Sequence, residues 1–454
     1  MKHILITLIF FCQLPLIAQS PKDTVTMTID DCIEYAVANS FKTNIQKTRT
    51  EDQKMAYNQA IMNHLPSISG GVGLETAFGR GVDPETNSYV NQSNLSNSYS
   101  LSGNIPIFQG LSILNQTRKA KISKLRGETE LTKVKDDVAI ETILAFAEAV
   151  YKKEIMILYS QMIEKYNMEL KKASRKYGLG AGSQTDVAQI KARLSQEKLV
   201  YIEAKNHYEI SLIKLKDQMN FPLEQDLALA SAEEELLRVQ YPEQSVEQVI
   251  AFALESNPKS QISRQTVDEE KLSLSIARGQ YYPSISLSGG INTAFFRQLD
   301  GDNYTSFSNQ FNNNLGQWVG VTLSIPIFDR NRARHQVKMA KSSLKRAILT
   351  NEQDDRLLRS EIRQALMELS AAEQTLELAR YNVKYQSLAN EAVAKKYEKG
   401  LSSIIELQTS DSDLFKSQLE LRNAILKYQI KIREVNYYKG VPFYNRGENR
   451  NPQQ

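Results

Sequence analysis

The residues that could catalyse a reaction or hold a metal are few in this chain, and they do not gather into a recognisable site. The four histidines are His3, His64, His207 and His335, and their spacing is not that of metal ligands. The sequence has no serine-centred nucleophile elbow, no phosphate-binding loop and no zinc motif. We therefore expect a protein that is not an enzyme, with no catalytic residue, no metal site and no cofactor.

Acidic residues recur at the same distance from a glycine in two parts of the sequence. The pattern Tyr-x-x-Gly occurs twice with an acid six residues after its glycine, from Gly180 to Asp186 and from Gly400 to Glu406. Asp413 lies seven residues beyond Glu406 and so on the same face of a helix, whereas Asp411 falls off that face. One interpretation of Glu406 is that it only pairs with a neighbouring basic side chain at the surface.

These acids belong to a chain of 454 residues whose segments recur in order. Residues 65–69 return at 282–286, and the Ile-Pro-Ile-Phe of 105–108 returns at 325–328. The offset stays near ~220 residues, which indicates one duplicated unit. We expect a first repeat over 19–244, a second over 245–443 and a polar tail over 444–454.

The N-terminus has the features of a secretory signal over residues 1–18. A short polar start precedes the apolar run 4–17, and Ala18-Gln19 offers a cleavage point. A membrane anchor is the alternative, but the run is shorter than the ~20 residues that a spanning helix needs. No later stretch is long and apolar enough to span a membrane, so contact with one would have to be made by β-strands.

Each repeat is predicted to begin with short helices, whose starts carry capping boxes at Thr28–Asp31 and Ser245–Gln248. A pair of alternating strands follows, over 67–108 and over 284–328. One face of each strand is apolar and the other is rich in Ser, Gly and Asn, and about ten residues is the length of a tilted strand that crosses a bilayer. The loops 79–97 and 297–317 are expected to be solvated. A soluble hairpin on a core is the alternative.

Long helical hairpins are predicted next, over 110–220 and over 329–439. No proline or glycine occurs from Phe328 to Lys399, and a helix of ~70 residues is roughly 100 Å long. A heptad seam on it predicts lengthwise packing as a coiled coil; its members are Leu358, Ile362, Ala365, Leu369, Ala372, Leu376, Ala379 and Val383. Glycines and small polar residues mark the turn of each hairpin, which we call the tips: Gly178, Gly180, Gly182 and Ser183, then Gly400, Ser402 and Ser403.

Four strands cannot close a barrel, because the smallest membrane barrels have about eight. An open sheet edge in lipid leaves backbone groups without partners, so strands placed in a membrane require several copies of the chain.

The repeat, the doubled Ile-Pro-Ile-Phe and the Tyr-x-x-Gly-acid pattern resemble the TolC outer-membrane efflux family over nearly all of the mature chain. The resemblance implies a mixed α and β fold. Each chain would give four strands to a trimeric twelve-stranded barrel in the outer membrane, continued by an α-helical coiled-coil tunnel in the periplasm. It also implies docking to a periplasmic adaptor protein and an inner-membrane pump. We expect the tips to contact the adaptor; the alternative is that their glycines only turn the chain.

The resemblance also places a constriction at the periplasmic end, formed by acids on the last helix. The first acid of the family pattern falls on Glu406, and the second falls on Thr409, which is not acidic. Asp413 could replace the lost acid, and Asp186 holds the matching position in the first repeat.

We therefore expect a passive exit duct of a tripartite efflux or type I secretion system, surrounded by outer-membrane lipid. A membrane-anchored structural or adhesive rod is the alternative. The net charge of +4, from 56 basic and 52 acidic residues, gives no sign of nucleic-acid binding. The cargo is not determined by the sequence.

Overall fold

The computed structural model describes residues 25–82, 87–91, 93–230, 245–299 and 305–445. The predicted signal segment 1–18 and most of the predicted tail lie outside these residues. The contacts within the chain divide it into two compact units, and each unit takes segments from both halves of the sequence. Unit 1 comprises 1–43, 135–244 and 364–454, and unit 2 comprises 44–134 and 245–363.

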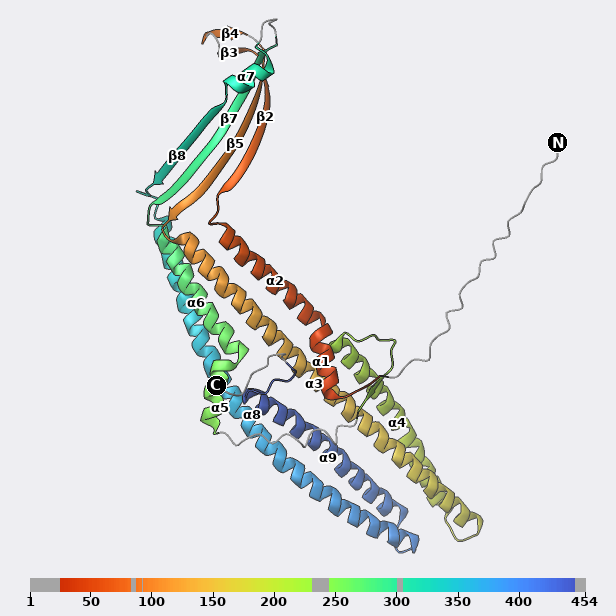
Figure 1. Cartoon of the computed structure of the whole chain (residues 1–454). Helices are drawn as coiled ribbons and strands as arrows, with labels where there is room; N and C mark the ends of the chain where they lie inside the picture. The colour runs from red at the N-terminus through yellow and green to blue at the C-terminus, as the bar shows by residue number, and fades with distance from the viewer. Residues whose placement is uncertain (1–24, 83–86, 92, 231–244, 300–304, 446–454) are drawn as a thin grey trace, which may run out of the picture. The chain divides into compact units, whose positions relative to one another are not determined.

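The same order of elements occurs in the two halves of the chain (Figure 1). In the first half the larger elements are α1 (Ile29–Asn39), α2 (Phe41–Met62), β2 (Ser67–Ala77), β5 (Asn94–Gln109), α3 (Ser112–Gly178) and α4 (Gln184–Met219). In the second half they are α5 (Val246–Ser256), α6 (Pro258–Gly279), β7 (Ser284–Gln298), β8 (Gly316–Ser324), α8 (Arg332–Glu398) and α9 (Ile404–Tyr438).

Unit 2 contains a four-stranded antiparallel sheet in the order β2-β5-β7-β8 (Figure 1). Its register places Val72 opposite Tyr99, Leu101 opposite Ile291 and Leu287 opposite Val321. Directly opposed residues share a face of an antiparallel sheet. The predicted apolar face of every strand therefore lies on one side of the sheet, and the Ser- and Gly-rich faces lie together on the other.

The two Ile-Pro-Ile-Phe segments differ in structure although their sequences are the same. Residues 105–108 lie inside β5, and the pairing of β5 with β7 shifts its register between Pro106 and Phe108. Residues 325–328 lie beyond the end of β8. A proline has no N–H to donate to a ladder. Beyond Asn104 the strand β5 pairs with β7 alone, and the shift brings Gln109 opposite Ser284, the first residue of β7. On the other side of β7, Ser324 of β8 already lies opposite Ser284, so residues 325–328 have no residue of β7 left to pair with. A bulge against a partner keeps β5 in the sheet past its proline.

The segments between the strands of each pair are more ordered than the sequence predicted. A small hairpin of β3 (Arg80–Val82) and β4 (Tyr89–Asn91) lies between β2 and β5. The helix α7 (Phe307–Asn313) lies between β7 and β8 and packs against one end of the sheet (Figure 1). The prediction of a wholly solvated loop over 297–317 is wrong, because the rings of Phe307 and Phe311 contact Tyr99 at 6.1 and 5.5 Å between centroids.

Unit 1 holds α1, α4, α9 and the segments of α3 and α8 from residues 135 and 364 onward. Both predicted capping boxes are confirmed, at Thr28 with Asp31 in unit 1 and at Ser245 with Gln248 in unit 2. In unit 1 the short strands β1 (Val25–Met27) and β6 (Leu227–Leu229) pair in parallel. Cys32 and Ile33 of α1 are fully buried and belong to the core of unit 1.

The predicted long helices are present as α3 and α8, each of 67 residues. On α8 the predicted seam is the less exposed face, and Leu358, Ile362, Ala365 and Leu376 are buried. The next heptad positions after Val383 are Gln386 and Asn390, and Asn390 is buried as well. A polar residue thus occupies a buried position of the seam close to the second tip.

Candidate functional site

The two tips fold alike at the level of single hydrogen bonds. At the first, Ala181 N–H donates to Lys176 O over 2.9 Å and Gly180 N–H donates to Tyr177 O over 3.0 Å. At the second, Leu401 donates to Lys396 O over 2.9 Å and Gly400 to Tyr397 O over 3.0 Å. Gly180 and Gly400 have φ of +76° and +73°. This is the Schellman ending of a helix, which favours glycine at the left-handed position.

The residues after these glycines start the returning helices. Ser183 caps α4 by accepting from Thr185 N–H over 3.1 Å, and Ser403 caps α9 by accepting from Glu406 N–H over 3.1 Å. At Gly182 a Cβ would lie 2.8 Å from Tyr177 N, so the first tip needs a residue without a side chain there. At Gly178 a Cβ would meet nothing within 4 Å.

Asp186 and Glu406 occupy the same position of their helices, the third after the N-cap serine. Glu406 is exposed, and its Oε2 accepts a hydrogen bond of 2.8 Å from Ser402 Oγ. The partner that the structure gives Glu406 is therefore a hydroxyl and not a basic side chain. Asp186 is half-buried. Burial of Tyr397 raises the pKa of its hydroxyl, and the negative charge of Asp186 raises that pKa further.

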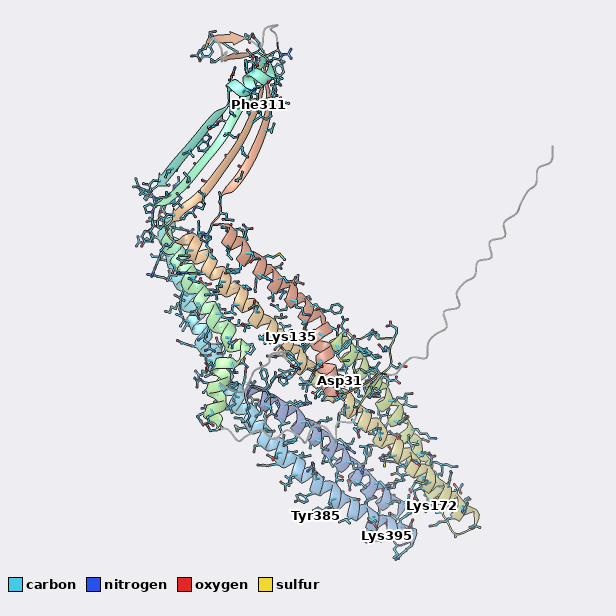
Figure 2. All side chains as sticks on the ribbon, in the orientation of Figure 1. Asp31, Lys135, Lys172, Phe311, Tyr385 and Lys395 are labelled. Carbon is cyan, nitrogen blue, oxygen red and sulfur yellow. The ribbon has the colours of Figure 1, made fainter. Side chains whose placement is uncertain are left out.

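Four helix ends meet at the tips around a small apolar cluster. Its buried members come from α3, α4 and α9: Ala173, Ile190, Ile404 and Leu407. Val393, Ala394 and Tyr397 of α8 pack against them. Lys172, near the end of α3 (Figure 2), lies 3.6 Å from Glu398 of α8 between Nζ and Oε1. The two hairpins are thus held together where they turn.

Asp411 is a buried acid of this region, although its spacing placed it off the helix face of Glu406. Its side chain is 0% exposed, and it forms an ion pair with Lys165 of α3. Asn390 Nδ2 of α8 donates to Asp411 Oδ1 over 2.6 Å, and Tyr166 Oη donates to Oδ2 over 3.3 Å. The carboxylate therefore joins α3, α8 and α9. By contrast Asp413, two residues on, is exposed.

The same polar cluster extends to α4. The Arg193 guanidinium lies 5.8 Å above the Tyr166 ring, donates to Ser412 Oγ over 3.1 Å and lies 2.7 Å from Glu197 Oε1. Burial raises the pKa of Tyr166, and the charge of Asp411 raises it further. Burial also raises the pKa of Glu197, although Arg193 opposes that shift. We call Lys165, Tyr166, Arg193, Glu197, Asn390 and Asp411 the polar latch.

Sequence reasoning missed the latch, and one signal could have found it. Asn390 continues the heptad seam of α8 as a polar residue among apolar ones, and a single buried Asn often fixes the register of packed helices. It also missed Leu179 and Leu401, which are 78% and 74% exposed beside the tip glycines.

The described residues contain no group of three or more His, Cys, Asp or Glu that could hold a metal ion. None of the helices in that part of the chain has a stretch long and apolar enough to cross a membrane.

Comparison with known proteins identifies the family. The family model for outer membrane efflux proteins matches residues 37–220 and 249–439. The outer membrane efflux protein BepC of Brucella suis biovar 1 (strain 1330) is 22% identical over 399 residues, which cover 87% of this chain and 82% of that protein.

Solved structures agree in fold. A crystal structure of CusC superposes with a TM-score of 0.78 at 14% identity, and the match covers 91% of this chain and 92% of the CusC chain. The outer membrane protein VceC from Vibrio cholerae superposes with a TM-score of 0.75 at 14% identity, and the match covers 91% of this chain and 96% of VceC. The fold is therefore shared although few residues are. Because the family model matches both halves of the sequence, the chain belongs to the outer membrane efflux protein family and is an outer-membrane efflux channel with a periplasmic helical part.

Proposed function

We propose that three copies of this chain close a twelve-stranded barrel and form the passive exit duct of a tripartite efflux or type I secretion system. The observation that carries this proposal is the two-faced sheet with two open edges. On its apolar face Ile68, Val72, Leu74, Val319, Val321 and Leu323 are between 57% and 81% exposed in the single chain. Such a face needs an apolar environment, and lipid supplies one.

The edges of the sheet support closure by copies of the chain. β2 and β8 are the outer strands, and because all neighbours are antiparallel, β2 and β8 run in opposite directions. Pairing β8 of one copy with β2 of the next would continue the antiparallel pattern around a ring. Two copies give eight strands and three give twelve. The resemblance to the TolC family, which implies a trimer, favours three. The polar face, rich in Ser and Gly, would then line a wet lumen.

The tips are proposed as the docking surface for a periplasmic adaptor. The exposed Leu179 and Leu401 and the turn residues Gly178, Gly180, Gly182, Ser183, Gly400, Ser402 and Ser403 support it. The double variant Leu179→Ser, Leu401→Ser should abolish efflux in cells, because it removes the apolar side chains of both tips. The trimer should still fold and reach the membrane, because neither leucine has the positive φ on which the turn depends. Leu223→Ser, which replaces a leucine that is 57% exposed and lies outside the tips, is the matched control and should leave efflux intact. Efflux that survives the leucine changes contradicts docking at the tips.

The constriction is proposed at Glu406, with Asp413 on the same helix face and Asp186 at the equivalent position of α4. Three copies of Glu406 around an axis would form a negative ring that favours cations. The exposure of Glu406 and Asp413 supports this placement, since a ring needs carboxylates that face water.

The experiment that tests the duct combines mass and conductance. The purified protein in detergent should have the mass of three chains and should give single-channel conductance in a planar bilayer. A stable monomer would contradict closure. A trimer without conductance would favour the other candidate, a membrane-anchored structural rod.

A further inference from the structure

The polar face of the sheet carries the one tryptophan of the chain. Trp318 of β8 lies opposite Gly290 of β7, which lies opposite Ser102 of β5, which lies opposite Ser69 of β2. Trp318 thus belongs to a row of small residues that crosses the whole sheet. Its same-face neighbours along β8 are Gly316 and Gly320, so the indole stands among side chains far smaller than itself.

Gly290 makes room for the indole. A Cβ at residue 290 would lie 3.2 Å from Trp318 Nε1, and also 2.7 Å from the carbonyl oxygen of Leu101. The indole nitrogen therefore lies over the backbone of β7, and Trp318 remains 49% exposed. A ring that rests on a glycine backbone and has half its surface open is fixed in place and accessible.

We propose that Trp318 is a stacking site for planar aromatic and cationic organic solutes on their way through the channel. The inference rests on the proposed function, because it requires that the polar face lines a water-filled lumen. Indole is the strongest aromatic partner for a cation, and an exposed aromatic face stacks planar rings of many kinds. Three copies would place three indoles at one level of the lumen. Weak binding suits a duct, because a solute must leave as readily as it enters.

A purely structural role is the competing explanation. Aromatic side chains often cover a glycine of a neighbouring strand and stabilise the sheet. That role predicts a loss of stability when Trp318 is replaced and no change in the behaviour of solutes.

The test uses the full-length trimer in lipid vesicles and in planar bilayers, with trimethylphenylammonium as the probe. Tryptophan fluorescence reports on Trp318 alone. Acrylamide in water should quench it, and lipids brominated on their chains should not. The probe should block the single-channel current in a saturable way, and Trp318→Leu should weaken that block about two- to five-fold, the range of an exposed cation–π contact. Trp318→Phe should retain part of the block, and Val319→Leu, on the other face of β8, should leave it unchanged.

The outcomes separate the inference from the proposed function. Quenching by brominated lipid would place the polar face in lipid and overturn both. Quenching by acrylamide, with equal block in the original protein and in Trp318→Leu, would overturn the stacking site and leave the duct intact. A lower melting temperature of Trp318→Leu with unchanged block would assign Trp318 the structural role and also overturn the proposal.

Discussion

Replacing Asp411 by asparagine tests whether the polar latch holds the two hairpins together near the tips. Asp411→Asn keeps the shape of the side chain but removes its charge and one of its two acceptor oxygens. Lys165 then loses its ionic partner. One of the two oxygens that accept from Tyr166 and Asn390 becomes an NH₂ donor, so one of these hydrogen bonds is lost or reverses its direction.

The size of the effect follows from burial. Breaking a buried ion pair by removing one partner costs about 3–5 kcal/mol. The Lys165 side chain is 32% exposed, so water replaces part of the lost interaction, and Asn390 still has Ser410 Oγ at 3.2 Å. We therefore expect a local loss of about 2 kcal/mol.

Hydrogen exchange measures this loss where it occurs. A change of about 2 kcal/mol corresponds to roughly 30-fold faster exchange of the amides that open with the latch. We expect that increase in the first turns of α9 and in the last turns of α3 and α8, with the mass of the assembled protein unchanged. The open probability in a planar bilayer should rise, because the tips separate more easily.

Asp413→Asn is the matched control, since it removes the same charge two residues away from an exposed position. Its effect should stay within about 0.5 kcal/mol, as for most surface substitutions. Equal exchange rates in the two variants, or an unchanged rate in Asp411→Asn, would refute the reasoning that burial makes Asp411 the anchor of the latch.

Three further predictions follow from single residues. Glu406→Gln should weaken cation selectivity and the block of the channel by divalent or trivalent cations, and unchanged selectivity and block in planar bilayers would place the constriction elsewhere. Burial raises the folded-state pKa of Glu197 above its ordinary value of 4.5. The contribution of Glu197 to stability is therefore fully present below pH 4.5 and is lost as the pH rises through the raised pKa. Glu197→Gln should flatten this part of the plot of melting temperature against pH, and an unchanged slope would contradict the prediction. Burial raises the pKa of the Cys32 thiol to about 12, so maleimide at pH ~8 should label Cys32 only after unfolding, and rapid labelling of the native protein would show that α1 opens.

The sequence predicted those features whose signal is local. The alternation of β2 and β7 predicted two faces, since side chains of a strand alternate whatever its neighbours are. The absence of proline and glycine predicted a long α8, and Gly180 and Gly400 marked the left-handed ends of α3 and α8, because only backbone sterics decide those positions.

Only the tertiary structure decided which side chains are buried together. Asp411 is separated from Lys165 by 246 residues, and Asp413 looks equally suitable from spacing on α9, yet one acid is buried and the other is exposed. Likewise the same Ile-Pro-Ile-Phe lies within the central strand β5 and beyond the end of the edge strand β8. In each case the outcome depends on what packs beside the residue, and contacts between distant segments leave no periodic trace in the sequence around any one of them.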